Sequence, residues 1–116
     1  MKVIIAGSRS VTDPAIVRKA VRESGFDVTQ IISGCCRGPD QMGEDYGHAH
    51  DIPVKLFPAD WARYGKAAGI IRNGQMAHHA DALIALWNGY SPGTRNMIDG
   101  MKKMGKPVFT MLSTNQ

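Results

Sequence analysis

The chain has 116 residues, the length of a single domain. Hydrophobic residues make up 43% and charged residues 21%, a balance that excludes disorder as the main state. The formal net charge of +4 favours anionic partners without choosing between small phosphates and nucleic acid. No apolar run approaches the ~20 residues of a membrane span, and residues 1–6 are too short for the apolar region of a signal peptide. We therefore expect a cytoplasmic protein without membrane contact.

Strand and helix signals alternate from the start of the chain. Residues 2–6 form a near-continuous apolar run, typical of a strand buried on both faces. Asp13 and Pro14 fit the N-cap and first position of a helix, and Gly25 fits its end. The elements predicted for this half are a strand over 2–6, a helix from 14 to 25, a strand over 28–33 and a helix over 39–50.

The second half continues the alternation after a long connection. Its predicted elements are a strand over 54–57, a connection over 58–69, a helix over 71–79, a strand over 82–86, a helix over 95–104 and a strand over 108–111. We expect the helix over 95–104 to turn Met97, Ile98, Met101 and Met104 inward. Residues 1–112 make one domain, and residues 113–116 make a polar, frayed tail.

This order of elements predicts an α/β fold: one mostly parallel five-stranded sheet with helices on both faces. In such sheets the ligand lies beyond the carboxyl ends of the strands, where the strand order reverses. The loops that follow the strands are therefore the places to search for chemistry.

Four of these loop regions each hold an arginine, namely Arg9, Arg37, Arg72 and Arg95. Arginine offers a planar fork of donors for phosphate, glycine lets backbone N–H groups approach an anion, and helix N-termini add partial positive charge. Together they predict a site for a phosphorylated or nucleotide-like ligand. Flat faces on which a base could stack are supplied by Trp61, Tyr64, Trp87 and Tyr90.

Plainer interpretations stay open for each feature. Any one glycine loop can be a simple turn, any one arginine a solvated surface residue, and the tryptophans core residues. Asp40 can serve only the dipole of its helix, and Thr94 can serve only as a helix cap. The adjacent Cys35 and Cys36 are expected to be reduced, and the histidine spacings do not suggest a metal site.

Several motifs occur in a characteristic order across residues 2–108. They are Gly7-Ser8-Arg9, Ser33-Gly34, Arg37-Gly38-x-Asp40, Pro58-Ala59-Asp60-Trp61, Tyr64-Gly65-Lys66-Ala67-Ala68-Gly69, Arg72-Asn73 and Gly89-x-Ser91-x-Gly93-Thr94-Arg95-Asn96. In these motifs the chain resembles the YpsA-related branch of the SLOG superfamily. The resemblance implies a single Rossmann-like three-layer domain, a nucleotide-derived ligand and a homo-oligomer, often a dimer.

Relatives within the superfamily include the Lonely Guy phosphoribohydrolases and the DNA-processing protein A family. Lonely Guy enzymes carry Pro-Gly-Gly-x-Gly-Thr-x-x-Glu, with a catalytic glutamate. In this chain no glutamate follows Thr94, and the nearest acid is Asp99. A second departure is Cys35-Cys36, where the family pattern has Gly-Ala. The resemblance therefore implies a kept phosphate cradle without the catalytic acid.

The loops and the resemblance together give one set of expected ligand-binding residues: Gly7, Ser8, Arg9, Ser33, Gly34, Arg37, Gly38, Asp40, Arg72, Asn73, Ser91, Gly93, Thr94 and Arg95. Asp40 is expected to accept hydrogen bonds from ribose hydroxyls. Asp40 and Asp60 are the candidates for catalysis, although nearby arginines should depress the pKa of Asp40 and make it a poor base. Asp60 and Trp61 can close the site or only tether the long connection.

Three functions remain in view at this point. The first is a sensor or binding protein for a nucleotide-derived small molecule, without cofactor or metal. The second is a phosphoribohydrolase or nucleotide N-glycosidase, against which the missing glutamate argues. The third is nucleic-acid binding, which the scattered lysines and the lack of a basic, aromatic stripe disfavour.

Overall fold

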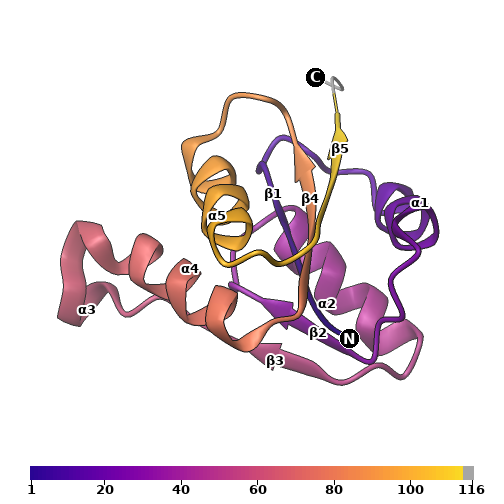
Figure 1. Ribbon diagram of the computed structural model, residues 1–116, viewed down its shortest axis with the longest axis horizontal. Helices are drawn as coiled ribbons and strands as arrows, with labels where there is room; N and C mark the ends of the chain where they lie inside the picture. Colours follow the sequence, from indigo (N-terminus) through magenta and orange to yellow (C-terminus); the bar gives the residue numbers. More distant parts are fainter. Residues whose placement is uncertain (114–116) are drawn as a thin grey trace.

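A computed structural model describes residues 1–113 of the protein. Its centre is one five-stranded sheet in the order β3-β2-β1-β4-β5, and every neighbouring pair of strands is parallel (Figure 1). The strands are β1 (Lys2–Gly7), β2 (Gln30–Ser33), β3 (Val54–Leu56), β4 (Ala82–Trp87) and β5 (Val108–Leu112). The predicted α/β class with a parallel five-stranded sheet is confirmed.

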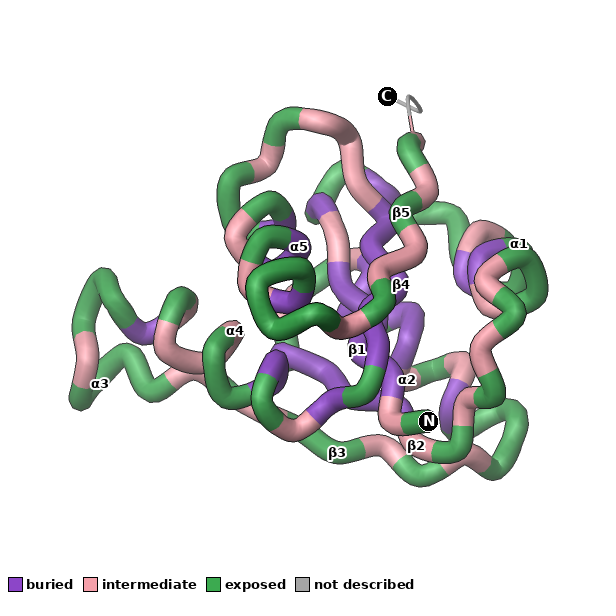
Figure 2. The backbone as a smooth tube through the Cα atoms, in the orientation of Figure 1, coloured by how far each residue is buried: buried purple, intermediate pink, exposed green. Residues whose placement is uncertain are grey.

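Helices cover both faces of this sheet. They are α1 (Ala15–Ser24), α2 (Pro39–Ala49), α3 (Trp61–Tyr64), the 3₁₀ helix η1 (Gly65–Ala67), α4 (Ala68–His79) and α5 (Pro92–Lys103). Alternate strand residues point to opposite faces, so Ile5 packs under α1 and α2 while Ile4 packs under α4 and α5. The two resulting clusters are the buried parts of the chain in Figure 2, and the fold is a Rossmann-like three-layer domain.

The strand order places one crevice. The chain moves from β1 outward to β3 on one side, and then returns to the other side of β1 for β4 and β5. The order thus reverses between β1 and β4, and ligand sites of open α/β sheets lie at the carboxyl ends of the two strands at such a point.

Two predicted helix starts and one connection are wrong. The connection over 58–69 contains α3 and η1, because the Asp60 side chain accepts a hydrogen bond from the Arg63 N–H and caps a short helix. α4 begins at Ala68, before the expected residue 71. α5 begins at Pro92 rather than Arg95, since proline fits a first helical position.

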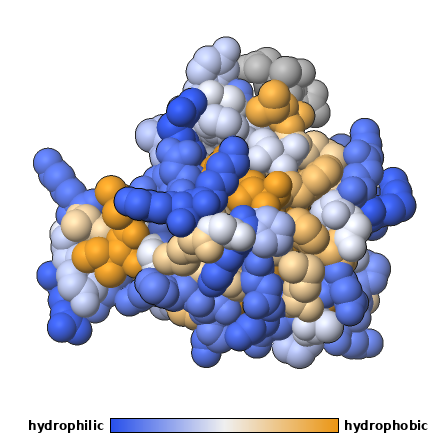
Figure 3. All heavy atoms as spheres, viewed as in Figure 1, coloured by the Kyte–Doolittle hydropathy of each residue, from blue (hydrophilic) through white to orange (hydrophobic). Residues whose placement is uncertain are grey.

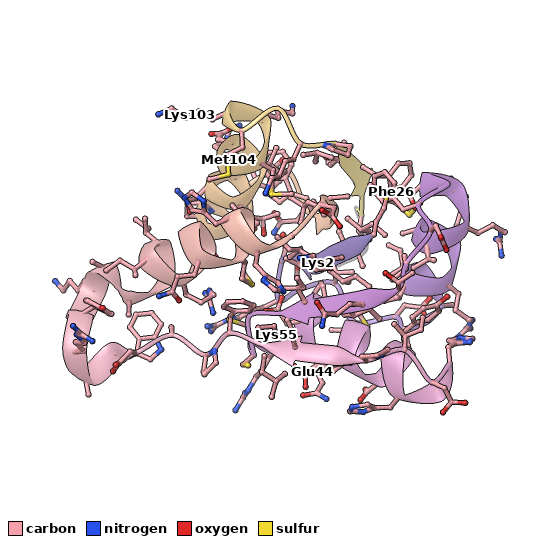
Figure 4. All side chains as sticks on the ribbon, turned by 60° about the horizontal axis from the view of Figure 1, so that its bottom comes forward. Lys2, Phe26, Glu44, Lys55, Lys103 and Met104 are labelled. Carbon is pink, nitrogen blue, oxygen red and sulfur yellow. The ribbon has the colours of Figure 1, made fainter. Side chains whose placement is uncertain are left out.

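The end of α5 also differs from the prediction. Met104 is exposed at the end of α5, beside Lys103, instead of facing inward (Figure 4). Ser113, the first residue of the predicted tail, donates its N–H to the Trp87 carbonyl at 2.8 Å. The remainder of the predicted tail, residues 114–116, lies outside the described residues. Within residues 1–113, no helix combines the length and apolar character of a membrane span.

One segment projects from the body of the molecule. We call residues 61–71, which comprise α3, η1 and the first turn of α4, the arm. Figure 1 shows α3 at the far end of this projection, and Figure 2 shows that most of it is exposed. Its only buried residue is Ala68, whereas the far half of α4 buries Met76 and Ala77 under the sheet.

Candidate functional site

A cleft of about 730 Å³ lies at the carboxyl ends of β1 and β4. Its walls come from the loop after β1, the loop after β4, the start of α5 and the arm. Predicted site residues that line it are Gly7, Ser8, Arg9, Asp40, Arg72, Asn73, Ser91, Gly93 and Thr94. Loops far apart in the sequence meet here because all five strands run in the same direction.

Hydroxyl groups occupy the junction between β1 and α5. The Oγ atoms of Ser8 and Ser91 lie 2.7 Å apart, and Ser91 Oγ donates to Thr94 Oγ1 at 3.0 Å. The N–H of Asn88 donates to Ser8 Oγ at 3.0 Å and ties the loop after β4 to the end of β1. Ser8 and Thr94 are buried, so the cleft has a fixed polar floor.

The first turn of α5 opens onto this floor. Ser91 is the N-cap residue, but no side chain within residues 1–113 caps the backbone N–H groups of the turn. Gly93 is exposed, and a Cβ there would meet no atom within 4 Å. Free N–H groups and the helix dipole make this turn suited to an anion.

Asp40 and Arg72 form a second wall around Gly34. Asp40 Oδ2 accepts a hydrogen bond from the Cys36 N–H at 3.2 Å. Arg72 Nη1 donates to the Gly34 carbonyl, and Arg72 Nε donates to Asn73 Oδ1 at 3.1 Å. A Cβ on Gly34 would lie 2.8 Å from Asp40 Oδ2 and 3.0 Å from Arg72 Nη1. The absence of a side chain at Gly34 therefore allows the two charged groups to approach the turn.

The expectation of a depressed pKa at Asp40 is wrong. Burial of this carboxyl, which is 5% exposed, raises its pKa to about 6. The N–H of Cys36 and the charge of Arg72 act in the opposite direction, but they do not offset the lost hydration. Asp40 thus changes charge near neutral pH, and sequence patterns do not reveal such a balance.

Other predicted residues lie outside the lining of the cleft. Ser33 is fully buried and donates to Glu44 Oε2 at 2.6 Å. Arg37 is exposed, and the Arg95 guanidinium lies over the Trp87 ring, 5.4 Å from its centre. Asp60 acts as the cap of α3.

Gly34 and Gly38 do not line the cleft, but they allow the groups around it to pack closely. Gly38 has a positive φ of 82°, and a Cβ there would lie 3.2 Å from Arg9 Cα. Glycine at this position lets the loops after β1 and β2 touch. Cys35 also has a positive φ, 66°. Both cysteines are free thiols.

Sequence reasoning missed part of the lining. Asn88 and Asn96 were not predicted as ligand-binding residues. The sequence could have indicated Asn88, because it is among the first polar residues after a buried strand. Asn96 Oδ1 accepts from Asn73 Nδ2 at 2.9 Å and joins α4 to α5. The arm adds Lys66, Gly69 and Ile70, beside Trp61, which the sequence had suggested as a stacking face. Helices this short leave no periodic pattern.

The other aromatic residues considered for base stacking do not line the cleft. Trp87 is half-buried, and its Nε1 donates to the Ser91 carbonyl at 3.2 Å. Tyr64 packs beside Arg63, and Tyr90 is 87% exposed. Among residues 1–113 there is also no cluster of three or more His, Cys, Asp or Glu side chains that suits a metal ion.

Comparison with known proteins adds a family. Residues 1–64 match the sequence model of the YAcAr family, described as the YspA, cpYpsA-related SLOG family. The chain is also similar to the Gene 61 protein of Mycobacterium phage D29, with 31% identity over 118 residues that cover 93% of this chain and 94% of the phage protein. No solved structure matches. The chain belongs to the YspA, cpYpsA-related SLOG family.

Proposed function

We propose that the cleft binds the phosphate of a nucleotide-derived small molecule, and that the protein acts as a sensor or binding protein. Membership of the SLOG family supports a nucleotide-related ligand-binding or processing role in general. The observation that carries the proposal is the uncapped first turn of α5 beside the hydroxyls of Ser8, Ser91 and Thr94. Such a turn attracts phosphate through N–H groups and the helix dipole.

The wall of the cleft that Asp40 and Arg72 form suits a ribose. Asp40 ionises above pH about 6, and its carboxylate then accepts hydrogen bonds from two hydroxyls. Arg72 and Asn73 are fixed by their own hydrogen bonds and orient the ligand from α4. A concave cleft of this kind favours a small molecule over a nucleic-acid strand.

A second candidate function is hydrolysis of an N-glycosidic bond. The observation in its favour is the raised pKa of Asp40, because a carboxyl that titrates near neutral pH suits general acid–base catalysis. Against it, no glutamate follows Thr94, and Asn96 lines the cleft instead. Binding without turnover is therefore the first proposal.

Thermal unfolding tests the proposal. The probes are AMP, ribose 5-phosphate, cyclic nucleotides, ADP-ribose and NAD, with released base followed by chromatography in the same samples. A ligand at 100 times its Kd adds about 2.7 kcal/mol, which raises the Tm by roughly 10 °C. A shift without released base supports binding alone, and released base supports the glycosidase.

Thr94→Val tests whether binding of the ligand depends on the proposed phosphate site. The change keeps the shape of the side chain and removes a hydroxyl at the proposed phosphate site. Loss of a hydrogen bond to a charged group weakens binding by roughly tenfold or more. Thr110→Val, at an exposed position of β5, is the matched control. The proposal is contradicted if the ligand raises the Tm of both variants equally. It is also contradicted if no phosphate-bearing probe raises the Tm of the original protein.

A further inference from the structure

The arm exposes two large apolar side chains at the edge of the cleft. Trp61 is 60% exposed and Ile70 is 63% exposed, yet both line the cleft. Figure 3 shows residues of high hydropathy in orange on this projecting part of the molecule, on a scale that does not colour tryptophan orange. Neither side chain belongs to the two buried clusters that stabilise the sheet. Their exposure therefore has no explanation in the core of the domain.

The local backbone places the Trp61 ring beside the first turn of α4. The Asp60 cap starts α3 at Trp61, and Gly65, with φ of 55°, ends this helix and turns the chain into η1. At Gly69 a Cβ would lie 3.7 Å from Trp61 Cη2, so the far end of the indole lies over a bare stretch of α4. The arm thus presents the indole at the side of the cleft.

The two ends of the cleft differ in chemistry. The α5 end carries hydroxyls and free N–H groups, whereas the arm end carries Trp61 and Ile70, with Met76 and Met97 also in the lining. Polar groups flank the apolar end. Lys66 lines the cleft, and Arg72 Nη2 lies 3.7 Å from the Cβ position of Gly69. A flat ring with an apolar face and a polar edge fits this combination.

We propose that the arm is the subsite for the nucleobase, with Trp61 as its stacking surface. The inference rests on the proposed function, because the α5 end takes the phosphate of the same ligand. The ribose then lies between the two ends, beside Asp40. Stacking on an aromatic ring tolerates every base, so the arm selects for the presence of a base more than for its identity.

Two probes that differ only by the base test this subsite, namely AMP and ribose 5-phosphate. The chain has two tryptophans, so Trp87→Phe leaves Trp61 as the sole indole fluorophore. AMP is expected to quench or shift the Trp61 emission, and ribose 5-phosphate is expected to leave it unchanged. Calorimetry on the protein with both tryptophans gives the affinities without relying on the Trp87 variant.

Variants of the arm complete the experiment. Trp61→Ala is expected to weaken AMP binding about tenfold or more and to leave ribose 5-phosphate binding unchanged. Trp61→Phe is expected to retain most of the AMP affinity. Tyr90→Ala is the control, since Tyr90 is a more exposed aromatic residue that does not line the cleft.

The outcomes separate this inference from the proposed function. If AMP binds in a Thr94-dependent manner but Trp61→Ala leaves its affinity unchanged, the arm is not the base subsite and the phosphate site stands. The same holds if Trp61→Ala weakens both probes equally. If no phosphate-bearing probe binds, the proposed function fails, and the base subsite fails with it.

Discussion

Asp40 carries a carboxyl group that is 5% exposed, and burial raises its pKa from 3.8 to about 6. Between these two values the folded protein binds more protons at this site than the unfolded chain does. The free energy of unfolding therefore falls as the pH rises from about 4 to about 6, and levels off above that range. The whole effect is about 3 kcal/mol, a stability cost that accompanies an ionised carboxylate in the cleft.

Asp40→Asn removes this titration while keeping the shape of the side chain. We expect the variant to resemble the original protein in stability at pH 4 and to exceed it by up to about 3 kcal/mol at pH 7.5. Urea unfolding at several pH values measures the difference. Asp45→Asn, at an exposed carboxylate of the same helix, should change little at either pH. A difference between Asp40→Asn and the original protein that stays constant with pH would show that Asp40 does not titrate in this range.

At the scale of elements, α4 depends on a residue outside it. Lys106 Nζ donates to the carbonyls of Ala77 at 2.7 Å, His78 at 3.1 Å and Ala80 at 2.7 Å. These groups surround the end of the helix, where carbonyls lack intrahelical partners and a cation complements the dipole. The lysine thereby stabilises the C-terminal end of α4, which packs against the sheet. The N-terminal turn of α4 belongs to the arm.

Lys106→Met keeps the aliphatic chain and removes the three donated hydrogen bonds. The expected loss is about 1–3 kcal/mol in the free energy of unfolding, measured by urea at neutral pH. Lys103→Met, at an exposed lysine at the end of α5 (Figure 4), should stay within about 0.5 kcal/mol of the original protein. Equal losses in the two variants would mean that the charge, and not the contact with α4, matters.

Comparison of predicted and observed elements shows what patterns encode. The buried strands and the inward faces of α1 and α5 follow from periodicity, and the parallel order then places Ser8, Asp40 and Thr94 at one edge. The arm was missed because α3 spans four residues, too few for a period. The sequence also did not reveal side-chain directions. The topology brings Arg95 to the edge of the sheet that holds the cleft, but it does not show that the Arg95 guanidinium lies over the Trp87 ring.

On the scale of the whole molecule, the placement of charge matters more than its sum. Arg37 in the loop after β2 and Arg95 in the first turn of α5 are exposed on the edge that holds the cleft, without lining it. Lys102 and Lys103 lie at the opposite end of α5, roughly 15 Å along the helix. Since the Debye length is about 8–10 Å at physiological salt, only the first pair acts strongly on an anion in the cleft.

Two double variants therefore test the electrostatics of the cleft. Arg37→Gln/Arg95→Gln and Lys102→Gln/Lys103→Gln each lower the formal net charge of +4 by two units. The arginine pair is expected to weaken AMP binding by about two- to fivefold at 50 mM salt, and this difference should vanish near 0.5 M salt because screening removes it. The lysine pair should leave the affinity unchanged at both salt concentrations, measured by calorimetry. Equal weakening in both variants would assign the attraction to net charge, and weakening that persists at high salt would mean that an arginine contacts the ligand directly.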